Sequence, residues 1–253
     1  MAEIVPILDL IKEKFSAIVN DRELGEEDVQ ITIAPLSARE AIGSPKREDY
    51  ALLEGKEVMI EARFRDSFGQ AFTDRPQDFH GPLKDVLNLS LDTKNNRAMF
   101  TATLNAVSAH LGLATGVRHC RDEEPETCAE EIAKNLLGRF GKIKIGLVGY
   151  QPAILEHLIR DFGVKKVRCM DLNPKNIGSH KFGIEIWSGR TETTKLITWS
   201  DLILVTSSSL VNNTFDAIRQ EATSQEKHLI IFGVTGAGAC ALTGVERLCF
   251  NAH

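Results

Sequence analysis

Two spacings of apolar residues divide the first 120 positions into helices and strands. Apolar side chains three and four positions apart predict helices over Glu3–Asn20, Pro82–Leu89 and Ala98–Leu111. Strict alternation predicts strands over Val29–Ile33, Val58–Phe64 and Phe68–Phe72. Residues 34–50 contain prolines and glycine and are expected to form a loop. Together these elements predict a small α+β domain over residues 1–121.

From Lys142 the pattern changes to short apolar runs separated by helical segments. Such runs are typical of strands buried in a parallel sheet, and they occur at Ile143–Val148, Lys166–Met170, Ile184–Trp187, Asp201–Val205 and Leu229–Phe232. Helical spacing is found over Pro125–Phe140, Pro152–Phe162 and Phe215–Ala222. The second domain, residues 122–253, is therefore predicted to be a Rossmann-like parallel sheet domain of the α/β class.

Charge and composition exclude several functional classes. The 30 basic and 35 acidic residues give a net charge of −5, without the basic stripe that nucleic-acid binding needs. No apolar stretch reaches the roughly 20 residues that span a bilayer, and the N-terminus lacks the basic region of a signal peptide. Five scattered cysteines suit a reducing compartment. We therefore expect a cytoplasmic protein that binds neither nucleic acid nor membrane.

Two glycine-containing loops are candidates for dinucleotide binding. Gly149-Tyr150-Gln151-Pro152 follows the first predicted strand of the second domain, but it lacks the G-x-G-x-x-G spacing. The string Gly236-Ala237-Gly238-Ala239-Cys240-Ala241 has a related spacing but follows the last predicted strand. We expect the first to be a plain strand-to-helix turn. The second is expected to be a flexible loop at the carboxyl edge of the sheet.

Two polar loops are stronger candidates for ligand binding. Asp171-Leu172-Asn173-Pro174 ends the second predicted strand of the parallel sheet, where an acid commonly meets a ribose hydroxyl, a metal or a polar substrate. A turn-forming role for these residues is the alternative. The segment Thr206–Thr214 holds seven polar residues in nine positions at a predicted helix start. It is competent to bind an anion, although helix capping alone explains one or two of these residues.

The segment Arg118–Cys128 gathers one imidazole, two thiols and several carboxylates within eleven residues. Its spacing matches no zinc-finger template, yet His119, Cys120 and Glu124 are ligand types that soft and borderline metals accept. A histidine next to a cysteine can also lower the thiol pKa and create a nucleophile. A charged helix start with incidental cysteines is the competing interpretation.

Six stretches of the chain resemble the prokaryotic family of putative heavy-metal chelation proteins, in which an enolase-N-terminal-like domain precedes a Rossmann-like domain. The matching stretches are Gly69–Thr73, Thr103–Ala106, His119–Glu126, Asp171–Pro174, Val205–Thr214 and Gly233–Gly238. The resemblance implies a site in the cleft between the two domains. Carried over residue by residue, it implies ligand-binding roles for Asn105, Asp171, Asn173, Thr206, Ser207, Asn212 and Thr214, and metal-binding roles for His119, Cys120 and Glu124.

Three functions remain open at this point. The first is a heavy-metal chelation or small-ligand-binding protein that uses the interdomain cleft, with a transition or heavy-metal ion as its cofactor. The second is an enzyme that acts on a small anionic substrate. The third is a nucleotide or S-adenosylmethionine binder that uses Asp171. The expected partner is a small molecule or a metal ion, and assembly into a homo-oligomer stays open.

Overall fold

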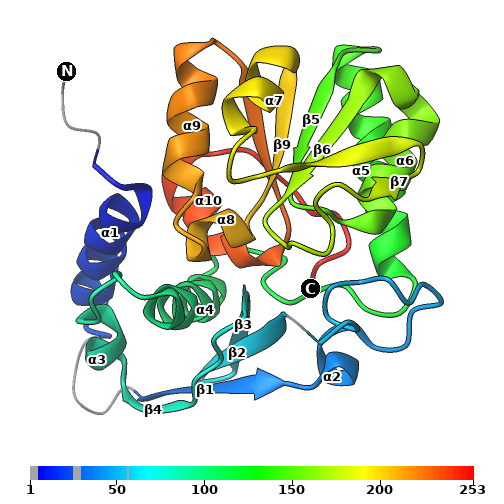
Figure 1. Cartoon of the computed structure of the whole chain (residues 1–253). Helices are drawn as coiled ribbons and strands as arrows, with labels where there is room; N and C mark the ends of the chain where they lie inside the picture. Colours follow the sequence, from blue (N-terminus) through cyan, green and yellow to red (C-terminus); the bar gives the residue numbers. More distant parts are fainter. Residues whose placement is uncertain (1–4, 25–29, 56) are drawn as a thin grey trace.

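The computed structural model describes residues 5–24, 30–55 and 57–253. The predictions for residues 3–4 and for Val29 lie outside these residues. Within them the chain forms a small antiparallel sheet and a larger, mostly parallel sheet, each covered by helices (Figure 1). The predicted fold class, an α/β protein with a smaller α+β domain first, is therefore confirmed.

The small domain consists of an antiparallel sheet with helices packed on it. Its strands are β1 (Gln30–Leu36), β2 (Val58–Phe64), β3 (Ser67–Thr73) and β4 (Phe79–Pro82), in the order β3-β2-β1-β4. Its helices are α1 (Ile7–Asp21), α2 (Ala38–Ile42), α3 (Leu83–Leu87) and α4 (Lys94–His110). Strands β2 and β3 form the predicted hairpin, with Ala62 opposite Gly69. A Cβ atom on Gly69 would lie 2.1 Å from the backbone nitrogen of Ala106, so only glycine lets α4 approach the sheet this closely.

The strands of the large domain form one sheet in the order β11-β10-β9-β5-β6-β8-β7. Its strands are β5 (Ile145–Val148), β6 (Val167–Asp171), β7 (His180–Lys181), β8 (Ile184–Ser188), β9 (Leu202–Thr206), β10 (His228–Phe232) and β11 (Arg247–Leu248). Its helices are α5 (Glu124–Phe140), α6 (Pro152–Phe162), η1 (Val164–Lys166), α7 (Thr193–Trp199), α8 (Ser208–Val211), α9 (Phe215–Ser224), η2 (Val234–Gly236) and α10 (Ala237–Thr243). The chain moves outward from β5 in both directions, so the topological switch point lies between β5 and β9.

The two faces of the large sheet bury different apolar sets, as expected for strands covered on both sides. Leu147 and Leu204 pack with the helices α5 and α6, whereas Val148 and Val205 pack with α7 and α9. The second of these cores continues into the small domain through α4 and α1. The two domains therefore share an apolar interface rather than meeting only through a linker.

Three local predictions are corrected by the structure. Residues 34–50 are not all loop: β1 continues to Leu36, and α2 begins with a capping box in which Ser37 and Glu40 each bond the other's backbone amide. The predicted flexible loop at 236–241 is mostly the helix α10, because burial against α4 outweighs its glycine content. The large sheet is not wholly parallel, since β7 pairs antiparallel with β8 at one edge.

Candidate functional site

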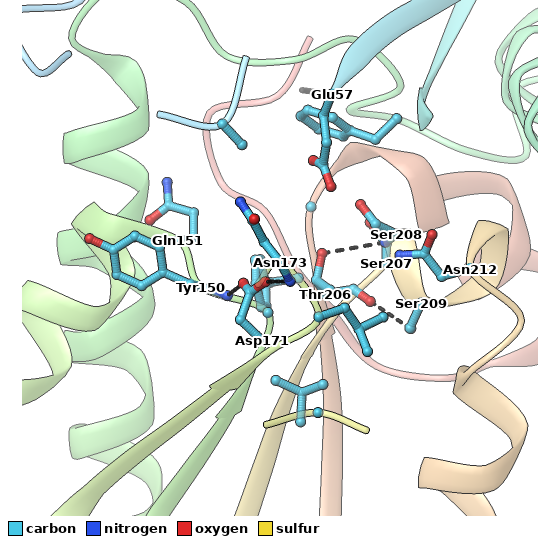
Figure 2. A pocket seen from close by; sticks show the side chains of 18 of the residues that line it. Glu57, Tyr150, Gln151, Asp171, Asn173, Thr206, Ser207, Ser208, Ser209 and Asn212 are labelled. Atoms are coloured by element: carbon cyan, nitrogen blue, oxygen red, sulfur yellow. Dashed lines mark hydrogen bonds between the residues drawn. The ribbon is translucent and has the colours of Figure 1, made fainter. Parts of the chain in front are cut away.

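A cavity of about 860 Å³ lies between the carboxyl ends of the large sheet and the small domain. The loops that follow β5, β6, β9 and β10 form one wall, and residues 49–52, 54, 57 and 72–74 of the small domain form the opposite wall. Figure 2 shows the part of the cavity around the switch point. Its place is the one where open α/β sheets bind ligands, because the loops diverge there and leave a crevice.

Asp171 stands at the end of β6 with its carboxylate anchored by two neighbouring loops. The Tyr150 backbone N–H donates to Asp171 Oδ2 at 2.6 Å, and the Asn173 backbone N–H donates to Oδ1 at 2.5 Å. Both bonds are drawn in Figure 2. Burial raises the pKa of the Asp171 carboxyl, although these N–H donors act in the opposite direction. Asp171 therefore fixes the geometry of two loops and still lines the cavity.

The polar loop after β9 lies beside Asp171 across the switch point. Thr206, Ser207, Ser208, Asn212 and Thr214 all line the cavity. Some of these polar groups form hydrogen bonds within the loop itself. The Ser208 backbone N–H donates to Thr206 Oγ1 at 3.3 Å, and Ser209 Oγ donates to the Thr206 carbonyl at 2.6 Å. The structure thus brings Asp171, Asn173, Thr206, Ser207, Asn212 and Thr214 together, as the sequence pattern suggested.

Glu57 is a cavity residue that no sequence motif indicates. It precedes β2 and enters from the small domain, with its carboxyl group directed toward the region of Asn173, Thr206 and Ser208 in Figure 2. Burial, followed by the negative charges of Asp171 and Asp74, raises the pKa of Glu57 to about 7, while Lys94 lowers it. No local sequence pattern predicts this raised pKa, since the burial of Glu57 depends on how the large domain packs against the small one.

The lining is acidic. Six described carboxylate residues line the cavity: Asp49, Glu54, Glu57, Asp74, Asp171 and Glu221. The basic residues among the described lining are Lys94 and Arg190, and Lys94 forms a 2.9 Å ion pair with Asp74. The local charge therefore favours a cationic or neutral ligand over an anion.

His119 and Cys120 lie in the wall of the same cavity, but they do not form an activated pair. His119 Nδ1 lies 2.5 Å from the Cys120 carbonyl oxygen, an acceptor, so this nitrogen carries the proton. Burial lowers the pKa of His119 to about 4, so the imidazole is neutral at pH 7. Burial also raises the pKa of the Cys120 thiol, and its sulfur lies 4.0 Å from His119 Nδ1. The expected lowering of the thiol pKa by the histidine is therefore wrong.

Two of the predicted residues have other roles. Asn105 is fully buried, and its amide binds backbone groups only: it accepts from the Gly238 N–H at 2.7 Å and donates to the Gln70 carbonyl at 2.8 Å. It joins α10 to the small sheet and does not appear in the cavity lining. Glu124 accepts from the Arg121 backbone N–H at 2.7 Å and contacts His253 Nε2 at 2.9 Å, also outside the lining.

The predicted metal ligands His119, Cys120 and Glu124 thus do not converge. Within residues 5–24, 30–55 and 57–253, no three His, Cys, Asp or Glu side chains are grouped closely enough to hold a metal ion. The donor types nevertheless suit a soft metal in part, because Cys120, Cys128 and Cys249 line the cavity together with His119. Cys128 belongs to the segment Arg118–Cys128, but the sequence does not predict that it lies near Cys249, since 121 positions separate them and no spacing template connects them.

The described part of the chain contains no helix that combines the length and apolar character needed to cross a membrane.

Comparison with known proteins connects this architecture to one family. Residues 133–243 match the sequence model of the DUF364 family, described as putative heavy-metal chelation. A protein of unknown function of that family from Pyrococcus horikoshii superposes with a TM-score of 0.53 at 19% identity, covering 91% of this chain and 80% of its own. A second such protein, from Desulfitobacterium hafniense, gives 0.51 at 13% identity, covering 93% and 83%. No protein with a curated description matches the chain.

At these identities the superpositions establish a shared fold and nothing about ligands. The sequence match covers much of the large domain, and it includes Asp171 and the segment Thr206–Thr214. The resemblance predicted from the sequence is therefore confirmed: residues 133–243 match the model of the family described as putative heavy-metal chelation.

Proposed function

We propose that this protein binds a small polar molecule or a heavy-metal ion in the cavity between its two sheets. One observation carries the proposal: loops from four parallel strands and the segment around Glu57 enclose about 860 Å³ at the switch point. This volume lies within the range of roughly 300–1,000 Å³ that small-molecule sites occupy. The family description supports the metal-binding part of the proposal, and the polar loops support the small-molecule part.

At the switch point the ligand would meet carboxylates, hydroxyls and amides. We assign its binding there to Asp171, Asn173, Thr206, Ser207, Asn212 and Thr214. Because, among the described lining residues, six carboxylates stand against two basic side chains, a ligand with a positive or neutral hydrogen-bonding group suits the cavity better than an anion. This balance weakens the alternative of an enzyme that acts on a small anionic substrate.

The position of Asp171 at the end of β6 favours one second candidate, a nucleoside or S-adenosylmethionine. The positive charge of S-adenosylmethionine suits an acidic cavity. The loop after β5 gives no support for a dinucleotide, because the Gln151 side chain already accepts from the Ile154 N–H at the start of α6. A pyrophosphate would have to displace that capping bond.

The test is a thermal-shift screen of the reduced protein against amino acids, adenosine, S-adenosylmethionine, inorganic phosphate, Zn²⁺, Ni²⁺ and Cu(I). A true ligand at 100 times its dissociation constant should stabilise the fold by about 2.7 kcal/mol. Amines, neutral nucleosides or soft metals should shift the midpoint, and phosphate should not. The proposal is overturned if no compound in the panel stabilises the protein.

A matched pair of variants then locates the site of any organic ligand. Asn212→Ala removes a cavity amide and should weaken binding by on the order of tenfold, the cost of about one hydrogen bond. Asn20→Ala changes an exposed amide in α1 and serves as the control. Equal affinity in both variants would place the ligand elsewhere.

A further inference from the structure

Three of the cysteines that line the cavity lie near one another, and the part of the cavity around them is called its thiol end here. Cys120 precedes α5, Cys128 lies in the first turns of α5, and Cys249 follows β11. All three cysteines are unoxidised and line the cavity. The remaining two cysteines, Cys169 and Cys240, are buried elsewhere and do not appear in the lining. The tertiary structure has therefore gathered three of the five thiols at one place.

Cys128 and Cys249 are in direct contact. The Cys249 thiol donates a hydrogen bond to the sulfur of Cys128, and the backbone N–H groups of Phe250 and Asn251 donate to the same sulfur. These donors lower the pKa of Cys128 against the effect of burial, while the shared hydrogen bond and burial raise the pKa of Cys249. The Cys128 thiol is thus the member of the pair that loses its proton more readily.

The C-terminal segment is fixed against the rest of the protein, which keeps this pair together. The Arg118 backbone N–H donates to the His253 carbonyl at 2.7 Å, and the His253 N–H donates to the Arg118 carbonyl at 2.9 Å. Arg247 Nη2 donates to the Thr115 carbonyl at 2.8 Å. Because bonds before and after Cys249 hold the segment, the two sulfurs meet without large loss of chain entropy when an ion binds.

We propose that Cys128 and Cys249 form a two-thiolate site for a soft monovalent metal ion, with Cu(I) as the representative. This inference rests on the metal-binding part of the proposed function and names its residues. Thiolate sulfur selects soft ions such as Cu(I), whereas Mg²⁺ and Ca²⁺ require oxygen ligands. Cu(I) accepts two ligands in a near-linear arrangement, so the absence of a preformed three-ligand group among the described residues does not oppose it.

The binding step involves no oxidation or reduction. Each thiol releases one proton to solvent, each sulfur donates one electron pair to the ion, and the ion keeps its charge of +1. The site then carries one net negative charge. Affinity should accordingly rise with pH, because protons compete with the ion for both sulfurs.

The experiment is an anaerobic Cu(I) titration of the full chain, with ascorbate as reductant and bicinchoninate as the competing chromophore. The wild type should take up one equivalent. Cys128→Ser and Cys249→Ser should each bind more weakly by about 100-fold or more, since loss of a direct ligand should exceed the roughly 10–100-fold cost of losing an outer-shell partner. Cys240→Ser is the matched control, because its thiol lies outside the cavity, and its affinity should equal that of the wild type.

A second measurement on the wild type keeps the test independent of how the serine variants fold. Native protein is alkylated with and without one equivalent of Cu(I), and the modified cysteines are mapped by mass spectrometry. The ion should protect Cys128 and Cys249 from the alkylating reagent. Unchanged labelling of both residues in the presence of bound Cu(I) would overturn the assignment.

The possible failures are distinguishable. If the wild type binds no Cu(I), both this site and the metal-binding part of the proposed function are wrong. If the wild type binds Cu(I) and both serine variants retain its affinity, only the Cys128–Cys249 assignment is wrong. Binding of an organic ligand that is sensitive to Asn212→Ala tests the opposite end of the cavity and is unaffected by either result.

Discussion

The two ends of the cavity are constructed differently. At the switch point, Asp171 and the segment Thr206–Thr214 are strand-end residues whose positions follow from the topology of the parallel sheet. At the thiol end, Cys128 and Cys249 meet because the C-terminal segment returns to α5. The polar residues at the switch point could be predicted from the sequence, because strands of a parallel sheet bring their carboxyl ends together. The thiol end depends on contacts between distant segments that no local spacing encodes.

Two carboxylates at the switch point show the same contrast on a smaller scale. Asp171 is bonded to the backbone of its own and the adjacent loop, so hydrogen bonds offset part of the cost of its burial, although its pKa is still raised. Glu57 comes from the opposite domain, and its burial next to Asp171 and Asp74 raises its pKa to about 7, opposed by the charge of Lys94. Ionisation of either carboxylate therefore costs folding stability, but at Asp171 backbone hydrogen bonds to two loops oppose that cost.

The largest expected effect follows from removing the Asp171 carboxylate. Asp171→Ala leaves the part-buried N–H groups of Tyr150 and Asn173 without acceptors, which should lower the free energy of unfolding by about 3–4 kcal/mol. Urea denaturation at pH 7 measures the change. Asp171→Asn keeps an acceptor for one of these N–H groups and should lose roughly half as much. A loss below about 1 kcal/mol for the alanine variant would contradict the anchoring role.

The second effect has the opposite sign and depends on pH. Because the pKa of Glu57 rises from 4.5 to about 7 on folding, the folded protein binds more protons than the unfolded chain between these values. Stability should therefore fall as pH rises through this window. Glu57→Gln removes the ionisation and should stabilise the protein at pH 8 by about 3 kcal/mol at most, with a difference that disappears below about pH 4.5.

Urea midpoints of wild type and Glu57→Gln at pH 4, 6 and 8 provide the measurement. Glu54→Gln is the control, because Glu54 is an exposed glutamate in the same wall of the cavity and should change stability by less than about 0.5 kcal/mol at each pH. A stability difference for Glu57→Gln that is constant across this pH range would refute the raised pKa of Glu57 in the folded protein.

The smallest effect is expected at Glu124, which the sequence placed among the metal ligands. Its carboxylate is partly exposed and bonds the Arg121 backbone and His253. Glu124→Gln should lower stability by about 1 kcal/mol or less, as for other exposed ion pairs. The Cu(I) affinity should stay at the wild-type value. Any tenfold loss of metal affinity in this variant would return Glu124 to the set of metal ligands.

The fold was largely predictable where hydrophobic patterns were long. The hairpin β2–β3 and the central strands β5, β6 and β9 appear within one or two residues of their expected positions. Very short elements were not predicted, because β4, β7 and β11 contain too few residues to show a period. The helix α10 was missed because its glycines suggest a loop. Gly238, however, packs where a Cβ atom would lie 2.8 Å from Leu104.

The sequence by itself determined the class of fold, the family resemblance and the polar end of the site, since periodicity and strand-end loops are local properties of the chain. The tertiary structure decided which polar side chains face the cavity and which form hydrogen bonds with backbone groups elsewhere. It assigned Asn105 to joining α10 with the small sheet, brought Glu57 opposite Asp171, and paired Cys128 with Cys249. The physical reason is that burial and long-range contact depend on how two domains pack together, and no pattern within a single segment specifies that packing.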